Sequence, residues 1–203
     1  MLEYTLESEL YEQGYTAVCG VDEAGRGPLC GPVVAAACIL PCGLVLEGLN
    51  DSKKLSEKKR DILFEQIKEN AIAYSIASAS VEEIDTLNIL EATLLAMRRA
   101  IGGLAVKADF ALIDGNVSRD FPIDAKAVIS GDATSPSIAA ASILAKVTRD
   151  RMCVVLDEAY PQYGIAKHKG YGTKAHMQAL REYGASPVHR KQFVRFLDKE
   201  KHE

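Results

Sequence analysis

Short apolar runs alternate along the chain with longer segments in which apolar residues recur every three or four positions. The short runs have the length of β-strands, and the periodic segments have the spacing of amphipathic helices. Five strands are expected, over Ala17–Asp22, Val33–Leu40, Ala71–Ala79, Phe110–Asp114 and Ala125–Ile129. Strands and helices interspersed in this way predict an α/β fold.

Helix starts are indicated by capping residues placed before the periodic segments. Ser80 followed by Glu83 matches a capping box, and Ser135 before Pro136 places an N-cap ahead of an N1 proline. A short helical turn is expected after Ser80. Longer helices are expected over Ser56–Asn70, Ile89–Ile101, from Ser135 towards Tyr160, Thr173–Tyr183 and Ser186–Lys199.

No repeat or Ser/Gly-rich linker interrupts the chain before about residue 160. We therefore expect one α/β domain over residues 1–160. Residues 161–203 would form a C-terminal helical segment that packs on the same domain.

The composition is that of a globular protein, with 48% hydrophobic and 26% charged residues in 203 positions. No apolar run reaches the ~18 residues that a membrane span needs. The first residues are acidic, unlike a signal peptide. Five cysteines without a CxxC pair argue against a zinc ribbon or a disulfide framework, and a cytoplasmic location fits best.

The net charge of −4 argues mildly against a nucleic-acid partner, but charge is unevenly distributed. The segment from Tyr163 to Arg195 contains seven Lys or Arg residues and only one acid. A second basic cluster covers Lys53–Arg60. These segments could bind a phosphate backbone if they share a face. Solvated helix surface explains them equally well.

Four acidic residues lie where predicted strands end or a helix begins: Asp22, Glu23, Asp114 and Asp132. Converging carboxylates repel one another and need cations to coexist in a cleft. Oxygen ligands without a Cys or His cluster select Mg²⁺ or Mn²⁺, two of which can hydrolyse a phosphodiester. Taken singly, Asp114 before Gly115 also fits a turn, and Asp132 fits an Asx-turn.

A glycine-rich loop, Gly25–Pro32, joins the first two strands. It fails as a GxGxxG dinucleotide fingerprint, because Cys30 stands where the third glycine is required and a strand follows instead of a helix. Glycines on both sides of Arg26 allow a ligand to approach the backbone closely. A tight hairpin with an exposed arginine is the alternative interpretation.

The order and content of these motifs resemble bacterial ribonuclease HII over roughly residues 17–196. The matching blocks are Asp22–Gly27 (DEAGRG), Gly31–Ala37 (GPVVAAA), Asp51–Ser56 (DSKKLS), Leu112–Asn116 (LIDGN), Gly131-Asp132, Ser142–Asp150 (SILAKVTRD), His168–Thr173 (HKGYGT) with His176, and Ser186–Arg190 (SPVHR). Cys30 departs from the pattern, which leads us to expect a small residue such as alanine there.

The resemblance implies a ribonuclease H-like mixed β-sheet flanked by helices and a two-metal site that uses Mn²⁺ or Mg²⁺. It also implies that residues 1–160 form the catalytic domain and that the C-terminal segment, residues 161–203, contributes to substrate binding. Asp22, Glu23, Asp114 and Asp132 match the family's metal-binding carboxylates. Gly25, Arg26 and Gly27 match the loop that recognises the ribonucleotide 2′-OH and the adjoining phosphate, and Tyr171 matches the tyrosine that senses the RNA-to-DNA junction. Candidate phosphate contacts are Lys53, Lys146, His168, Lys169, Thr173 and Arg190, each of which is explained equally well as surface charge.

The implied activity is an endonuclease that cuts the RNA strand of RNA–DNA hybrids and cuts 5′ of single ribonucleotides in duplex DNA. It would leave 3′-hydroxyl and 5′-phosphate ends and remove misincorporated ribonucleotides. A ribonuclease HIII-type enzyme and a non-catalytic hybrid-binding protein are the alternatives. The first normally has an extra N-terminal domain, for which only about 16 residues precede the first strand. The family suggests a monomer, a sliding-clamp contact is left open, and Asp198–Glu203 shows no clear partner-binding motif.

Overall fold

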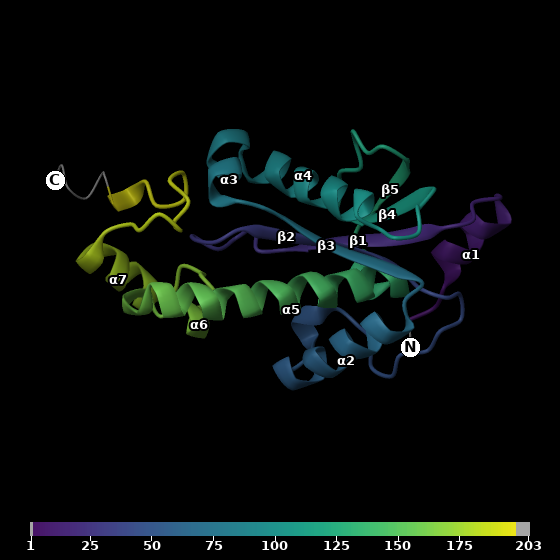
Figure 1. Cartoon of the computed structure of the whole chain (residues 1–203), viewed down its shortest axis with the longest axis horizontal. Coiled ribbons are helices and arrows are strands. Elements are labelled where there is room, and N and C mark those ends of the chain that lie inside the picture. Colours follow the sequence, from purple (N-terminus) through teal and green to yellow (C-terminus); the bar gives the residue numbers. More distant parts are fainter. Residues whose placement is uncertain (1, 198–203) are drawn as a thin grey trace.

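The computed structural model describes residues 2–197 as a central sheet between two layers of helices (Figure 1). The sheet contains β1 (Val18–Ala24), β2 (Val33–Ile39), β3 (Ala73–Ala79), β4 (Phe110–Asp114) and β5 (Asp124–Val128), in the order β3-β2-β1-β4-β5. Strands β1 to β3 pair antiparallel, whereas β4 and β5 run parallel to β1. The mixed sheet expected from the sequence is therefore confirmed.

The helices divide between the two faces of the sheet. In Figure 1, α3 (Val81–Leu87) and α4 (Ile89–Gly102) cover one face, and α2 (Glu57–Asn70) and α5 (Pro136–Ala159) cover the other. α1 (Thr5–Glu12) lies at one end of the sheet. α6 (Ile165–His168) and α7 (Lys174–Tyr183) lie at the opposite end, beside the C-terminal part of α5. Short 3₁₀ turns cover Ser52–Lys54, Gly131–Ala133 and Pro161–Tyr163.

The predicted caps start these helices as expected. Ser80 accepts a hydrogen bond from the Glu83 amide while the Glu83 carboxylate accepts one from the Ser80 amide, which completes the capping box of α3. Asn88 caps α4, and Ser135 accepts from the Ile138 amide at the start of α5. In each case a local side chain satisfies amide groups that the first helical turn leaves without a partner.

Alternating residues of each strand point to opposite faces of the sheet and contribute to the hydrophobic core on each face. Cys19, Val21 and Ile113 pack toward the α4 layer, and Val34 and Ala36 pack toward α2 and α5. Small residues on both surfaces bring α5 unusually close to β1. A methyl group added at Gly20 would lie 2.1 Å from the Ser137 carbonyl carbon, so this glycine is a packing requirement.

Two parts of the chain differ from expectation. α1 was not predicted, since its N-cap residue Tyr4 makes no side-chain cap hydrogen bond. The helix expected over Ser186–Lys199 is wrong for residues 186–195, which form turns and an isolated bridge between Cys30 and His189. The Arg190 amide donates to the Leu29 carbonyl there, a contact that a helix would not allow; residues 198 and 199 lie outside the described part.

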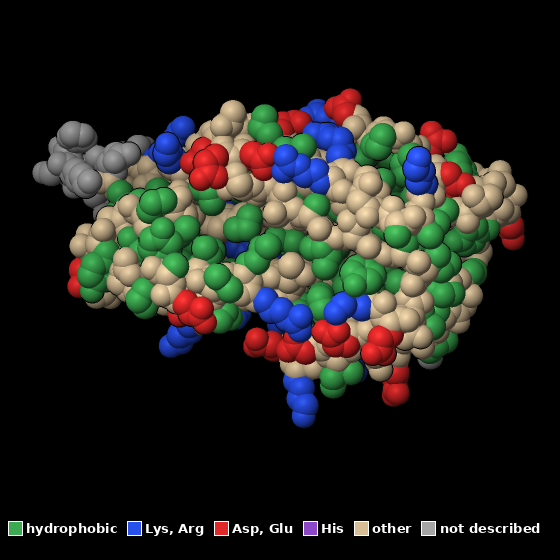
Figure 2. Space-filling model, in the orientation of Figure 1, with side chains coloured by type: hydrophobic (Ala, Val, Ile, Leu, Met, Phe, Trp, Pro, Cys, Tyr) green, Lys and Arg blue, Asp and Glu red, His purple; other side chains and the backbone are tan. Residues whose placement is uncertain are grey.

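The surface carries mixed charge. On the face shown in Figure 2, acidic and basic side chains alternate along the upper and lower rims, and apolar side chains gather between them. Among the described residues, none of the helices is both long and apolar enough to cross a bilayer.

The approach of α5 to β1 can be tested with one glycine. We expect Gly20→Ala to lower the free energy of unfolding by about 3 kcal/mol or more, because backbone atoms of Ser137 and Ile138 cannot yield to the added methyl group. Gly102→Ala is the matched control, since nothing lies within 4 Å of its added methyl group and the change stays within about 1 kcal/mol. Denaturant titration measures both; equal stability of the two variants would contradict the packing account.

Candidate active site

The parallel pairing of β1 and β4 brings two of the predicted acids together. Val21 pairs with Ile113, so Asp22 and Asp114 follow one position later at the same edge of the sheet. Both alternate away from the α4 layer, toward which Val21 and Ile113 pack. β1 also continues to Ala24, beyond the expected end at Asp22.

Asp132 joins this pair through the turn that precedes α5. The Gly131 amide donates to Asp114 Oδ1 at 2.7 Å, which ties the turn to the end of β4. Carboxylate oxygens of Asp22, Asp114 and Asp132 then lie within 4.8 Å of one another. Glu23 lies beside them and forms an ion pair of 3.5 Å with Arg26.

The three-acid centre is electrostatically costly. Asp22 is only 4% exposed, and its pKa is raised well above the ordinary value by burial and by the neighbouring carboxylates of Glu23 and Asp114. Burial and Asp114 also raise the pKa of Asp132. Clustered carboxylate oxygens without soft ligands fit a hard divalent cation, which would relieve this repulsion.

One further residue of this centre, Asp51, was not singled out from the sequence, and Lys53, which was predicted to contact phosphate, lies close enough to interact with the acids. Asp51 caps the 3₁₀ turn Ser52–Lys54 and is one of the carboxylates that raise the pKa of Asp132. Burial lowers the pKa of Lys53, but Asp22, Asp132, Asp51 and Asp114 outweigh it and the net shift is upward. The block of sequence around Asp51 matched a family motif, which was the available signal.

Buried hydroxyl groups support Asp22 from behind. Ser142 of α5 hydrogen-bonds to the Asp22 carboxylate, and its hydroxyl lies 2.9 Å from that of Ser52. This chain of contacts links α5, β1 and the 52–54 turn. The position of Asp22 therefore depends on three elements that are far apart in the sequence.

A pocket of about 180 Å³ opens next to Glu23. It brings together most of the residues predicted to contact substrate. The lining residues include Gly25, Arg26, Gly27, Lys53, Lys146, Arg149 and Tyr171. A methyl group added at Gly27 would lie 3.5 Å from Cε1 of Tyr171, so the tyrosine ring lies next to the glycine-rich loop.

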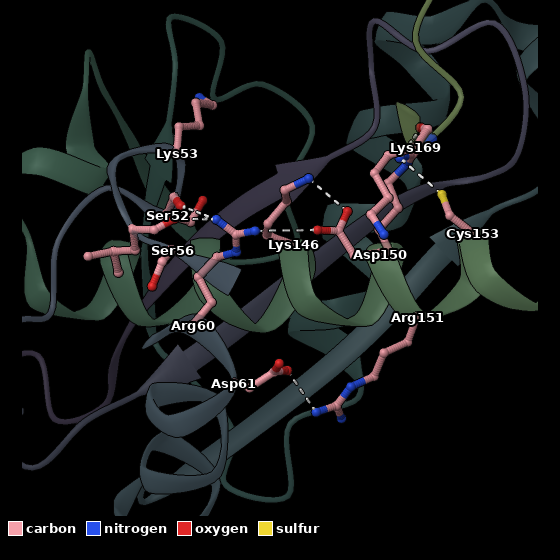
Figure 3. A network of polar contacts seen from close by, with 12 residues as sticks. Ser52, Lys53, Ser56, Arg60, Asp61, Lys146, Asp150, Arg151, Cys153 and Lys169 are labelled. Atoms are coloured by element: carbon pink, nitrogen blue, oxygen red, sulfur yellow. Dashed lines mark hydrogen bonds and ion pairs between the residues drawn. The ribbon is translucent and has the colours of Figure 1, made fainter. Parts of the chain in front are cut away.

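Lys146 is held at this pocket by a network of ion pairs. Its Nζ lies 2.7 Å from Asp150, one turn further along α5, and Arg60 approaches the same carboxylate at 3.7 Å. Figure 3 shows Lys146 and Arg60 converging on Asp150 from two different helices. Arg60 also donates to the carbonyls of Ser52 and Leu55, which connects this network to the turn that carries Lys53.

Arg190 has a different place from the one expected. Its side chain is fully buried, so the prediction of a direct phosphate contact does not hold. Its guanidinium group instead donates to carbonyl oxygens of the glycine-rich loop. The acceptors are Gly25 (2.6 Å), Arg26 (3.0 Å), Pro28 (2.8 Å), Gly31 (2.9 Å) and Pro32 (3.3 Å).

Arg149, which sequence reasoning did not select, completes this support. It is 2% exposed and donates to the carbonyls of Cys30, Pro32 and Lys169. Within residues 2–197, neither Arg149 nor Arg190 lies within ion-pair distance of a carboxylate. Burial and the neighbouring Arg149 lower the pKa of Arg190 to about 10. Arg190 therefore stays charged at neutral pH. Both arginines hold the loop carbonyls inward.

The remaining candidates lie around Tyr171 and mainly shape its loop. The Lys169 carbonyl accepts from Arg149, and Thr173 caps α7 through the His176 amide. Both ring nitrogens of His168 have backbone partners, the Tyr163 carbonyl and the Gly170 amide. These three residues are not among those that line the pocket beside Glu23.

A mixed sheet with acidic side chains gathered where β1 and β4 end has the ribonuclease H-like architecture, and the class of protein that it defines is a nuclease. A family model described as Ribonuclease HII matches residues 19–199. The chain belongs to the ribonuclease HII family and is an endoribonuclease hydrolase.

Individual relatives agree with this assignment. A ribonuclease HII of Desulfitobacterium hafniense (strain DSM 10664 / DCB-2) is 59% identical over 188 residues, which are 93% of this chain and 72% of that protein. The ribonuclease H2 structure from Pyrococcus horikoshii OT3 has a TM-score of 0.76 at 26% identity and covers 93% of this chain and 100% of its own. A PCNA:RNase HII complex from Archaeoglobus fulgidus gives 0.70 at 27% identity, over 86% and 94% of the two chains.

The role of Arg190 can be separated from its charge. We expect Arg190→Lys to lower the free energy of unfolding by about 2–4 kcal/mol, because one ammonium group cannot serve five buried carbonyls. Arg151→Lys changes an exposed arginine on α5 and should stay within about 0.5 kcal/mol. Thermal unfolding measures both variants; if Arg190→Lys is as stable as the wild type, the loop does not depend on the guanidinium geometry.

Proposed function

We propose that this ribonuclease cuts the RNA strand of RNA–DNA hybrids and cuts 5′ of single ribonucleotides embedded in duplex DNA, leaving 3′-hydroxyl and 5′-phosphate ends. Its biological role would be the removal of misincorporated ribonucleotides. One observation carries the proposal. Three carboxylates lie within 4.8 Å of one another beside a pocket lined by Gly25–Gly27 and Tyr171.

Asp22, Asp114 and Asp132, with Glu23 beside them, would hold two divalent cations, Mn²⁺ or Mg²⁺. The hard oxygen donors and the raised pKa of the buried Asp22 carboxyl support this ligand set. When bound, such cations supply an activated water and stabilise the leaving oxygen of the phosphodiester. Ser142 and the Glu23 amide, which donates to Asp22 Oδ1 at 2.7 Å, orient the Asp22 carboxylate for this task.

The glycine-rich loop would recognise the ribonucleotide. Because Arg190 occupies the carbonyls of Gly25 and Arg26, the loop has amide N–H groups and the Arg26 side chain to offer a ligand. Such donors suit the 2′-OH and the adjoining phosphate, and the 2′-OH is the group that distinguishes ribose from deoxyribose. Gly25 has a backbone φ of +101°, and the Arg149 side chain lies against it, so a larger residue would not fit at this position.

Tyr171 would pack on the sugar that follows the ribonucleotide. Tyr171 is 49% exposed and its Cε1 lies beside Gly27, so a sugar bound at the loop would meet this ring. Lys53 and Lys146 line the same pocket from the other side and are the phosphate contacts that we favour. Residues 161–197 would thus contribute to substrate binding, as expected for the C-terminal segment.

The cysteines bear on the cellular location of the protein. All five cysteines are free thiols, which suits a reducing compartment such as the cytoplasm. A monomeric state stays a prediction. A contact with a sliding clamp stays open, and Asp198–Glu203 lies outside the described residues.

The carboxylate assignment is tested by Asp22→Asn. We expect cleavage of a duplex containing one ribonucleotide to fall by at least about 10²-fold, because even indirect support of a metal ligand is worth 10–100-fold. Folding and duplex binding should survive, as measured by circular dichroism and fluorescence anisotropy. Normal cleavage by this variant with added Mg²⁺ would refute the assignment, and wild-type cleavage that persists in excess chelator would refute metal dependence.

The junction role of Tyr171 predicts a substrate-dependent loss. Tyr171→Ala should reduce kcat/KM on a single-ribonucleotide duplex by about tenfold more than on a long hybrid, which corresponds to about 1.4 kcal/mol of contact energy. Tyr183→Ala serves as the control, because Tyr183 is also exposed but lies at the end of α7. Equal losses on the two substrates would count against junction sensing.

A further inference from the structure

Three buried side chains behind the glycine-rich loop have no part in the chemistry described so far. The Sγ of Cys30 and a ring nitrogen each of His176 and His189 lie within 4.8 Å of one another. His176 is 0% exposed and His189 is 3% exposed. The group has the composition of a soft-metal site, so its hydrogen bonds decide what it can do.

The backbone fixes the position of a proton on each ring. His176 Nδ1 lies 3.0 Å from the Tyr171 carbonyl oxygen, which can only accept, so His176 Nδ1 carries its proton. The Ser186 amide donates to His189 Nδ1 at 3.0 Å, so that nitrogen offers its lone pair. A neutral His189 must therefore carry its proton on Nε2.

The two rings then fit each other in one direction. Their Nε2 atoms lie 3.1 Å apart, and the His189 Nε2–H donates to the free lone pair of His176 Nε2. Hydrogen bonds thus run from the Ser186 amide through both rings to the Tyr171 carbonyl. A proton added to His176 would set two N–H groups against each other, and one added to His189 would face the Ser186 amide.

A metal ion does not fit this arrangement. Ligation through both Nε2 atoms would require both rings to carry their protons on Nδ1, but His189 Nδ1 faces a backbone donor. Space is also short, since a methyl group added at Gly170 would lie 2.9 Å from Cys30 Sγ. The Cys30 side chain therefore packs against the backbone at Gly170.

We call this chain of hydrogen bonds, from the Ser186 amide through His189 and His176, the histidine relay. It ends on the backbone carbonyl of Tyr171. The Gly170 amide donates to His168 Nδ1, and the Gly170 carbonyl accepts from Leu29 of the glycine-rich loop. His168 in turn stacks on His176 with 4.4 Å between ring centroids. Tyr171 is 49% exposed, so few side chains pack on it. The position of its ring is therefore set mainly by these contacts to the neighbouring backbone.

We propose that His176 and His189 are positioning residues for Tyr171, and that their directional hydrogen bonds set how well the enzyme distinguishes a single ribonucleotide from a long hybrid. The inference rests on the proposed role of Tyr171 at the RNA-to-DNA junction. Both histidines are buried, and neither lines the pocket beside Glu23. Their effect is exerted through the Tyr171 carbonyl.

The proton positions can be tested without activity. In ¹⁵N-labelled protein at neutral pH, long-range ¹H–¹⁵N spectra should show His176 as the Nδ1–H tautomer and His189 as the Nε2–H tautomer. Two rings in the same tautomer, or a charged ring, would overturn the relay. Both rings protonated on Nδ1 would favour the metal site instead.

Two substitutions at one position separate the donor from the ring. His176→Phe keeps a stacked ring but loses the hydrogen bond to the Tyr171 carbonyl. His176→Asn keeps a donor at the position of Nδ1. We expect the ratio of kcat/KM for the single-ribonucleotide duplex to that for the long hybrid to fall about tenfold in the Phe variant and by less than about threefold in the Asn variant.

Tyr163→Phe is the matched control, because it removes a hydrogen bond of 2.9 Å to the Gly184 carbonyl in the same cluster but leaves the relay intact. It should leave the ratio unchanged. A parallel fall in cleavage of both substrates in the Phe and Asn variants would show a purely structural role and overturn the proposal.

A double-mutant cycle distinguishes this inference from the proposed function beneath it. In a Tyr171→Ala background, His176→Phe should not change the substrate ratio further, since its effect passes through the missing ring. If Tyr171→Ala alters the ratio but His176→Phe does not, the positioning role fails while the junction role stands. If Tyr171→Ala itself leaves the ratio unchanged, the junction role fails, and with it this use of the relay.

Discussion

Parallel pairing of β1 with β4 is the constraint on which the rest of the site depends. It places Asp22 and Asp114 at the same edge of the sheet, and the Gly131 amide adds Asp132 by bonding to Asp114. Side chains of like charge are then held together with little exposure to water, at a cost that nothing in the fold itself requires. The surrounding groups, Lys53 and the serine pair behind Asp22, offset only part of that repulsion. Under the proposed function, bound cations would offset the remainder.

The opposite charge lies on the far side of the pocket and is arranged differently. Arg149 and Arg190 are buried without a carboxylate partner among residues 2–197, and backbone carbonyls take up their donors. Carbonyl oxygens solvate a guanidinium but do not neutralise it, so the positive charge persists behind the loop. Under the proposed function, this positive charge would favour a substrate phosphate at Gly25–Gly27, although the net charge of the protein is −4.

Much of this arrangement was predictable because its signals are local. Capping residues such as Ser80 and Ser135 fix helix starts within three residues of sequence, and apolar runs fix strands. Asp22, Glu23 and Asp114 were found because they follow predicted strands, and Asp132 because it precedes a helix, although the convergence of Asp22, Asp114 and Asp132 needed the topology. Arg190 was misjudged because an arginine near other basic residues looks the same in sequence whether it faces solvent or five carbonyls. α1 was missed because its buried residue Glu7 is polar and bonds to Ser135, 128 positions away.

The groups proposed for catalysis and those proposed for recognition are held by different parts of the fold. The acids belong to β1 and β4 of the central sheet and to the turn before α5. The glycine-rich loop follows β1 directly, yet its conformation is determined by Arg149, Gly170 and Arg190. Its carbonyls are satisfied only once the C-terminal part of the chain has folded against it. Changes around α7 would therefore affect the conformation of the loop before that of the carboxylates, whereas changes at Gly20 or Ser142 would affect the carboxylates first.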